Sequence, residues 1–277
     1  MTTDAVSAPR VRIDSSTSVD GLMITLADGV LSITMNRPDS LNSLTEAMLS
    51  GIADAVERAA DDDRVRVVRL GGAGRGFSSG AGISEEDQKG GGTSSPTKII
   101  DEANRAVRAL TALPKPAVAV VHGPAAGVAA SLALGCDVVL ASEDTFFMLA
   151  FTKIGLMPDG GASALVAAAV GRTRAMRMAL LAERIPAREA LDWGLITAVY
   201  PADEFEAEVD KVTATLVNGP AVAFRKTKQA INAATLTELE NAFEREKQGQ
   251  SALITSHDFV EGALAFQQRR SPSFTDS

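Results

Sequence analysis

The sequence has one cysteine, two histidines and no long apolar run, and each of these shortages excludes a class of protein. Cys136 alone cannot form an intramolecular disulfide, and we interpret it as a small buried core residue because it lies between two apolar runs. His122 and His257 are far apart in the sequence and have no cluster of other ligands near them, so no metal site is predicted. No segment approaches the roughly 20 apolar residues that a membrane-spanning helix needs.

The sequence also has fewer basic than acidic residues. The chain carries 27 Lys and Arg against 35 Asp and Glu, a formal net charge of −8. Nucleic acid is therefore not an expected partner, because binding to its phosphates requires clustered cations. A small anionic ligand stays possible, since a few local cations and helix N-termini are enough to bind one. The N-terminal segment lacks the compact apolar core of a secretory signal and contains acidic residues, so we expect a cytoplasmic enzyme.

Composition and length predict a folded protein with one α/β core. Of the 277 residues, 45% are hydrophobic and 22% are charged, which is a globular balance. Asp28-Gly29 between two alternating runs is a hairpin signal. Strands are expected at 22–26, 30–35, 65–70, 118–121, 138–141 and 196–200. Helices are expected at 45–60, 99–113, 128–134, 162–170, 173–182, 187–193, 205–217, 222–234, 237–251 and 256–270.

The order of these elements suggests how the chain is divided. Strands and helices alternate as far as Gly161, and beyond it the pattern is almost entirely helical, which favours an α/β core with a helical tail. Residues 1–19 are polar and rich in Ser and Thr, and we expect a disordered tail there. We therefore expect a core over 20–200 and a C-terminal helical region over 201–277.

Two glycine-rich turns each follow an expected strand. One spans 71–82, and the other leads through His122-Gly123-Pro124 to Gly127, which opens a small apolar helix. Two such turns could bring two backbone N–H groups to one point and form an oxyanion hole, which stabilises charge developing on a carbonyl oxygen. Spacing alone favours the simpler interpretation of ordinary turn chemistry. The first turn is not a dinucleotide fingerprint, because no helix follows it directly.

The segment 84–97 contains three consecutive glycines and almost no apolar residue. A mobile loop of this kind beside a binding turn can act as a lid over a ligand. A plain surface insertion is an equally good interpretation.

Four motifs carry a resemblance to a known family. They are Asn36-Arg37-Pro38 with Leu41-Asn42, the turn GGAGRGFSSGAGI, the run KPAVAVVHGPAAGVAASLALGCDVVLAS, and FTKIGLMPDGGAS. Together they resemble the crotonase superfamily of enoyl-CoA hydratases and isomerases over about 21–274. The PDGG turn and the C-terminal ending are most similar to the isomerases of bacterial phenylacetate degradation.

The resemblance implies a fold and a set of partners. The fold would be a crotonase-like spiral of ββα units, with C-terminal helices that build a homotrimer or a dimer of trimers. The ligand would be an acyl-CoA, so coenzyme A would enter as part of the substrate and no permanently bound cofactor is expected.

The resemblance also implies a catalytic site. The backbone amides of Ala81 and Val128 would form the oxyanion hole, and Asp159 matches the catalytic aspartate of the isomerases. The two glutamates of the hydratases align with Ser131 and Phe151, neither of which can act as a carboxylate base, and this counts against ordinary hydration. An isomerase needs only one base. From its position alone, however, Asp159 before two glycines is better interpreted as a helix N-cap.

Further ligand contacts follow from the same resemblance. Ser131, Phe146 and Phe151 would line the acyl pocket, although a serine in a helix of small residues is more often a packing residue. The coenzyme A moiety would contact Arg37, Leu41, Ser79, Lys226 and Lys228, although lysines on a helix surface are usually only solvated. Three functions stay open: an enoyl-CoA isomerase, which we favour, an enoyl-CoA hydratase, and a non-catalytic acyl-CoA-binding protein.

Overall fold

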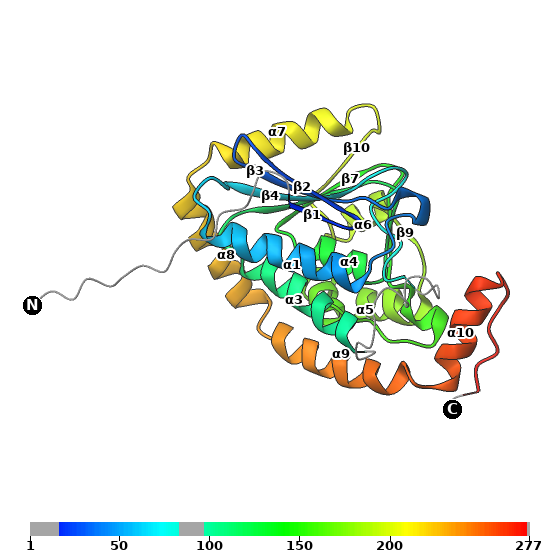
Figure 1. The fold of residues 1–277 in the computed structure, drawn as a ribbon. Helices are drawn as coiled ribbons and strands as arrows, with labels where there is room; N and C mark the ends of the chain where they lie inside the picture. The colour runs from blue at the N-terminus through cyan, green and yellow to red at the C-terminus, as the bar shows by residue number, and fades with distance from the viewer. Residues whose placement is uncertain (1–16, 83–96, 276–277) are drawn as a thin grey trace, which may run out of the picture.

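The computed structural model describes residues 17–82 and 97–275 (Figure 1). The described residues therefore leave out 1–16 of the expected tail and 84–96 of the expected lid or insertion. Our prediction for the end of the tail is wrong. Residues Thr17–Val19 form strand β1, which pairs antiparallel with the first strand of the hairpin.

A seven-stranded sheet forms the centre of the molecule, in the order β1-β2-β3-β4-β5-β7-β10. The predicted hairpin is confirmed, because Asp28 and Gly29 both have positive φ angles, 48° and 81°, as a two-residue hairpin turn requires. From β3 onward, neighbouring strands are parallel. The strands after β1 are β2 Leu22–Ala27, β3 Val30–Met35, β4 Val67–Gly72, β5 Ala117–Val121, β7 Val138–Ser142 and β10 Ala198–Tyr200.

Helices cover both faces of this sheet (Figure 1). One face packs on α1 Glu46–Asp61 and α4 Val128–Leu134. Helices α3 Lys98–Ala112 and α5 Ala162–Leu181 pack against these two, and the four helices enclose the main hydrophobic core with the sheet. The predicted cap of α1 is confirmed, because Thr45 accepts a hydrogen bond from the Met48 amide at 3.2 Å. The opposite face packs on α7, Phe205–Val217, through a smaller core that includes Val118, Leu140 and Phe205.

A second, three-stranded sheet lies beyond the first, in the order β6-β8-β9. Its strands are very short: β6 is Pro124–Ala126, β8 is Phe146–Met148 and β9 is Ile185–Pro186. The 3-10 helices η1 Pro38–Ser40 and η2 Ala150–Ile154 and the helix α6 Ala187–Asp192 are similarly short. Strand β6 matters for the site because it ends directly before Gly127.

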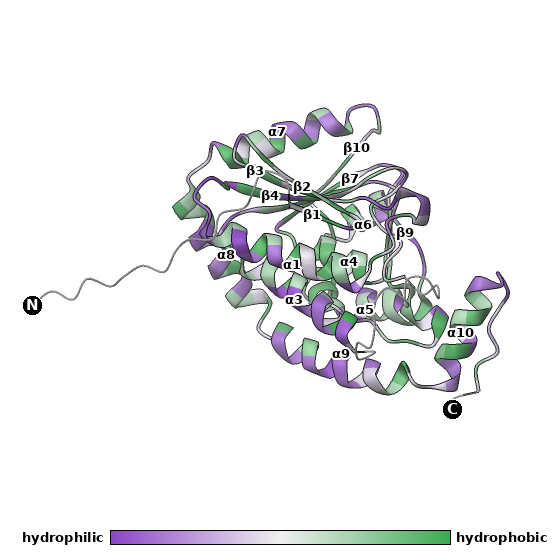
Figure 2. Cartoon of the chain, viewed as in Figure 1, coloured by the Kyte–Doolittle hydropathy of each residue, from purple (hydrophilic) through white to green (hydrophobic). Residues whose placement is uncertain are grey.

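Three helices close the chain: α8 Ala221–Thr235, α9 Leu239–Leu253 and α10 His257–Gln267. Helix α9 packs on α5 and α3, and α10 packs on η2. Figure 2 shows that all three helices carry both hydrophobic and hydrophilic residues. Within the described ranges, no helix combines the length and apolarity that a membrane crossing requires.

Candidate active site

The structure brings the two glycine-rich turns together. The Ser78 amide donates to the Pro124 carbonyl at 2.9 Å, and the Ala126 amide donates to the Ser78 carbonyl at 3.1 Å. Just beyond these hydrogen bonds, Gly80 and Gly127 lie in contact, because a methyl group added at Gly80 would be 3.5 Å from the Gly127 Cα. The residues that follow them, Ala81 and Val128, are therefore close neighbours.

The amides of Ala81 and Val128 are available to a ligand. The Leu44 amide donates to the Gly80 carbonyl, and the Gly82 amide donates to the Leu44 carbonyl, so the intervening Ala81 amide points away from Leu44. Val128 is the first residue of α4, and its amide has no acceptor within the helix. Among the hydrogen bonds between described residues, neither amide donates to a carbonyl. Their role as an oxyanion hole stays a prediction.

Asn42, to which the sequence alone gave no role, holds the first turn in shape. Its side-chain Nδ2 donates to the carbonyls of Ala73 and Gly76, each at 2.8 Å, and to that of Phe77 at 3.2 Å. Its Oδ1 accepts the Arg37 amide at 2.8 Å, and the side chain is completely buried. Both the nitrogen and the oxygen of this side-chain amide are therefore hydrogen-bonded, and they hold residues 37–42 against the turn.

The predicted coenzyme A contacts Arg37, Leu41 and Ser79 gather beside this turn. The Arg37 guanidinium donates to both the carbonyl and the hydroxyl of Ser43, at 2.8 and 3.0 Å. The Ser79 amide donates to the Leu41 carbonyl at 2.9 Å. These three residues are thus placed together at the rim of the first turn, as a shared ligand contact would require.

Asp159 is a buried acid with one free oxygen. Only 8% of the residue is exposed, and its Oδ2 accepts a hydrogen bond from Gln250 Nε2 at 2.8 Å. Its Oδ1 is buried without a hydrogen-bond partner among the described residues. Burial raises the pKa of Asp159 to about 7; the Gln250 hydrogen bond opposes this rise, and the negative charge of Glu246 adds to it. Such a carboxyl can exchange a proton near neutral pH.

Asp159 is also next to the second turn. A methyl group added at Gly160 would lie 2.9 Å from Ser131 Cβ and 3.2 Å from Val128 Cγ2. The Ser131 hydroxyl donates to the Asp159 carbonyl at 2.8 Å, which fixes the main chain against α4. The main chain at Asp159 and Gly160 therefore packs on α4, against the side chains of Ser131 and Val128.

The interpretation of Asp159 as a helix cap is wrong. Helix α5 begins after Gly161, and Glu246 from α9 accepts the amides of Gly161 and Ser163 at 2.7 and 2.8 Å. Glu246, which is distant in the sequence, therefore caps the start of α5. The side chain of Asp159 is left for another role.

The two phenylalanines predicted to line an acyl pocket occupy different places. Phe151 on η2 is buried, and a methyl group added at Gly127 would lie 3.9 Å from its ring. Phe146 is the first residue of β8 and pairs with Pro124. The Arg184 guanidinium carbon is 4.7 Å from the centroid of the Phe146 ring. Phe151 is therefore beside Gly127 at the end of the second turn. Phe146 lies at the start of the same turn, where its amide donates to the Gly123 carbonyl at 3.2 Å.

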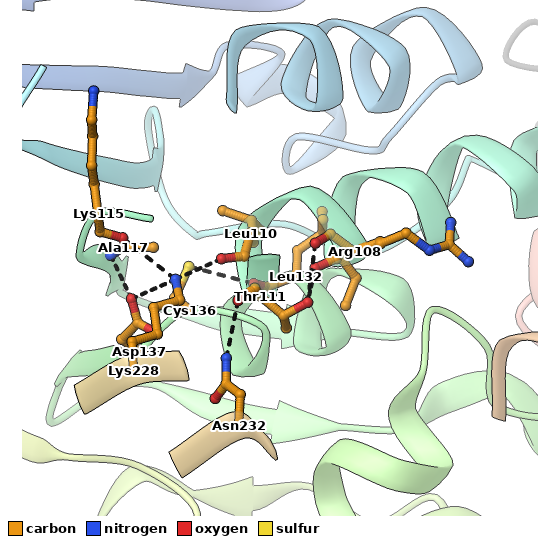
Figure 3. Close-up of polar contacts among 11 residues, drawn as sticks. Arg108, Leu110, Thr111, Lys115, Ala117, Leu132, Cys136, Asp137, Lys228 and Asn232 are labelled. Carbon is orange, nitrogen blue, oxygen red and sulfur yellow. Dashed lines mark hydrogen bonds and ion pairs between the residues drawn. The ribbon is translucent and has the colours of Figure 1, made fainter. Parts of the chain in front are cut away.

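Lys228 has a structural role in this chain (Figure 3). Its Nζ donates to the Leu110 carbonyl and to Asp137 Oδ2, both at 2.8 Å, and lies 3.4 Å from the Lys115 carbonyl. An ammonium group has three donors, and these contacts use all three. The structure thus differs from our prediction that Lys228 binds a phosphate of coenzyme A. Lys226 is exposed on the same helix.

We expect Lys228→Met to destabilise the protein by about 2 kcal/mol, because it removes the charged donor to the Leu110 carbonyl and to the partly exposed Asp137 carboxylate. Urea unfolding measures this loss. The Michaelis constant for an acyl-CoA should not change while the protein is folded. Lys226→Met is the matched control and should not alter stability. A raised Michaelis constant with unchanged stability in Lys228→Met would instead favour coenzyme A binding.

The remaining reactive side chains do not assemble into a second site. Cys136 is buried, which confirms our interpretation of it as a core residue, and burial raises the pKa of its thiol. His122 Nε2 lies 3.0 Å from the Gly74 carbonyl. Across residues 17–82 and 97–275, no three His, Cys, Asp or Glu side chains cluster as metal ligands would.

Fold and site together define an α/β protein in which two backbone turns and one buried acid meet beside a short helix. The family model described as Enoyl-CoA hydratase/isomerase matches residues 25–277. The chain belongs to this family, within the crotonase superfamily, as its motifs predict. Its α/β architecture with C-terminal helices is that of the family.

Relatives of this chain carry the names of both reactions. It is 36% identical to the 1,2-epoxyphenylacetyl-CoA isomerase of Escherichia coli K12 over 249 residues, which is 89% of this chain and 95% of that one. It is 39% identical to a probable enoyl-CoA hydratase of Rhodobacter capsulatus over 250 residues, or 90% and 96% of the two chains. A crystal structure of an enoyl-CoA hydratase from Mycobacterium avium subsp. paratuberculosis K-10 is 71% identical, with a TM-score of 0.88, and the match covers 94% of this chain and all of that one.

Proposed function

We propose that this protein is an enoyl-CoA isomerase that moves a double bond by proton transfer, with Asp159 as the proton carrier. The observation that carries the proposal is the state of Asp159: it is buried, its Oδ1 has no hydrogen-bond partner among the described residues, and burial raises its pKa to about 7. The packing of the neighbouring Gly160 against the Val128 side chain supports the same conclusion, because it brings the turn that carries Asp159 to the helix that begins at the second candidate oxyanion donor.

The proposed reaction needs only groups that the chain itself supplies. The amides of Ala81 and Val128 donate to the thioester oxygen of the acyl-CoA. The Asp159 carboxylate removes a proton from a carbon of the acyl chain, and the electron pair moves into an enolate held by the two amides. The protonated Asp159 then returns the proton to a carbon further along, so the double bond is displaced and no atom is gained or lost.

The two positions that carry glutamate in the hydratases support isomerisation. Ser131 uses its hydroxyl to bind the Asp159 carbonyl, and Phe151 is an apolar side chain beside Gly127. Neither residue can take a proton from water. Among the described residues, Glu246 is bound to the amides of Gly161 and Ser163, so Asp159 is the acid beside these two positions that can carry a proton. An isomerase requires only one such acid.

Hydration of a 2-enoyl-CoA is the second candidate, because the relative of known structure at 71% identity bears the name enoyl-CoA hydratase. Product analysis distinguishes the two. We expect 3-enoyl-CoA thioesters to be converted to the 2-enoyl isomers with no change in mass. Formation of a product heavier by one water at a comparable rate would favour the hydratase, and tight binding without turnover would favour a non-catalytic acyl-CoA-binding protein.

The raised pKa of Asp159 predicts a specific pH dependence. The carboxylate is the form that removes a proton, so kcat/KM should rise as pH increases through about 7 and become constant above it. Steady-state rates between acidic and mildly alkaline pH measure this profile. A rate that is flat down to pH 5 would contradict Asp159 as the base.

We also propose that the protein assembles as a homotrimer or a dimer of trimers. Helix α10 exposes large apolar side chains, including Val260, Leu264 and Phe266, which are 63%, 43% and 65% exposed in the single chain. Exposed apolar groups on one helix are typical of a face that another subunit covers. Sedimentation of the purified protein tests the assembly.

A further inference from the structure

Helix α9 fits closely against the turn that carries Asp159, and each side supplies a glycine. A methyl group added at Gly161 would lie 2.7 Å from Leu239 Cδ1 and 2.8 Å from Phe243 Cε1. In return, Gly249 on α9 leaves room for the side chain of Met157, which a larger residue would displace. The helix can therefore reach the turn with its backbone close by, and its side chains can act on residues 157–163.

Two polar residues on the buried face of α9 use this proximity. Glu246 and Gln250 are one helical turn apart, and they are only 1% and 2% exposed. Glu246 accepts the amides at the start of α5, as described above. Gln250 Oε1 accepts the Met157 amide at 3.2 Å, and its Nε2 donates to Asp159 Oδ2 at 2.8 Å. Because only the oxygen of the amide can accept the Met157 N–H, the nitrogen must face Asp159.

We infer that Gln250 is a positioning residue, which holds the Asp159 carboxyl in one orientation and makes Oδ1 the oxygen that exchanges the proton. This inference rests on the proposed function. The amide is itself anchored to the main chain at Met157, so it presents a fixed donor to Oδ2. Oδ2 therefore already accepts a hydrogen bond, and Oδ1, which has no partner among the described residues, is the oxygen left to exchange the proton.

The charges around Asp159 explain why a fixed donor is needed there. Among the described residues, Glu246 from α9 is the charged group that acts on Asp159, and it disfavours the carboxylate. From α4, Ser131 supplies a hydroxyl, but it binds the Asp159 main chain. At the start of α5, the amides of Gly161 and Ser163 donate to Glu246, and the Ala162 amide donates to the Asp159 carbonyl. Gln250 is therefore the side-chain donor that favours the carboxylate against burial and against Glu246.

The test compares three variants of the full-length protein. Gln250→Met removes the donor at similar size, and Gln250→Glu replaces it with a second acid. Phe243→Leu is the control, because it loosens the same helix contact without changing a polar group. The carboxyl of Asp159 is titrated without ligand, by carbon NMR of protein labelled at aspartate, and Asp159→Asn identifies its resonance.

We expect Gln250→Met to raise the titration midpoint of Asp159 by about 1 pH unit, because a hydrogen bond to the charged form is lost. Gln250→Glu should give two coupled steps separated by more than about 1 unit. The rising limb of kcat/KM should move by the same amount in Gln250→Met, with the rate largely recovered at high pH and KM unchanged. Phe243→Leu should lower stability and leave the midpoint in place.

An unshifted midpoint in Gln250→Met, with only stability reduced, would overturn the inference, because Gln250 would then be a packing residue. The result for the proposed function is separate. A shifted midpoint together with full activity in Asp159→Asn would keep the Gln250–Asp159 coupling but contradict Asp159 as the proton carrier.

Discussion

Asp159→Asn is expected to lower kcat for double-bond migration by about 10³-fold, because an amide cannot take up and return the proton. The size of the effect follows because the neighbouring described side chains do not replace the acid. Ser131 donates its hydroxyl to the Asp159 carbonyl, and Phe151 is apolar. Glu246 is bound to the amides of Gly161 and Ser163. Acyl-CoA affinity should be retained, since the ligand contacts proposed here lie on the backbone and at the rim of the first turn. Single-turnover rates and equilibrium binding measure the two quantities.

Stability gives an independent check on the same variant. The folded state raises the pKa of Asp159 from 3.8 to about 7, so the folded protein binds this proton more tightly than the unfolded chain does. Stability is therefore lost as pH rises between these two values. Asp159→Asn removes this cost, and above pH 7 it should unfold at a higher urea concentration than the wild type. Asp137→Ala, which removes the acceptor of the Lys228 ammonium and of the Ala117 amide, should instead lose stability and keep its kcat.

Val128→Pro is expected to lower kcat by about 10²- to 10³-fold, because proline removes one of the two amides that would hold the thioester oxygen. The substitution suits the backbone, since Val128 is the first residue of α4 and proline is well accepted at that position of a helix. The preceding residue is Gly127, which has a φ of 56° and the conformational freedom that the change demands.

Val128→Ala is the matched control for the amide. It shortens the same side chain but keeps the N–H, so its kcat should stay within about tenfold of the wild type. Circular dichroism and thermal unfolding confirm that both variants fold. Equal kcat values for the proline and alanine variants would contradict a catalytic role of the Val128 amide.

The sequence predicts the long, periodic elements well and the short ones poorly. Asp28-Gly29 and Thr45 carry local signals, so the hairpin and the start of α1 follow from a few neighbouring residues. The break at Gly171 between two predicted helices is also present, as a non-helical residue within α5. Strands such as β6 and β8 have three residues each, too few to show any periodicity.

The candidate site is predicted only in part, because much of it depends on contacts between distant segments. Asp159 follows from the family resemblance, but the partner of its carboxylate lies 91 positions along the chain. Glu246 and Gln250 are polar residues within a helix, a pattern that usually indicates a solvated face. They are buried because Gly161 and Gly249 let α9 approach the turn, and no local pattern in the sequence shows that approach. Lys228 was misinterpreted for the same reason.

The most direct test of the account is solvent-deuterium incorporation into 3-enoyl- and 2-enoyl-CoA thioesters, followed by mass spectrometry, for the wild type and Asp159→Asn. We expect the wild type to give a shifted double bond and to introduce deuterium at the carbons that lose and gain the proton, and we expect both signals to vanish in Asp159→Asn. Migration with undiminished exchange in Asp159→Asn, or addition of water in place of migration, would contradict it.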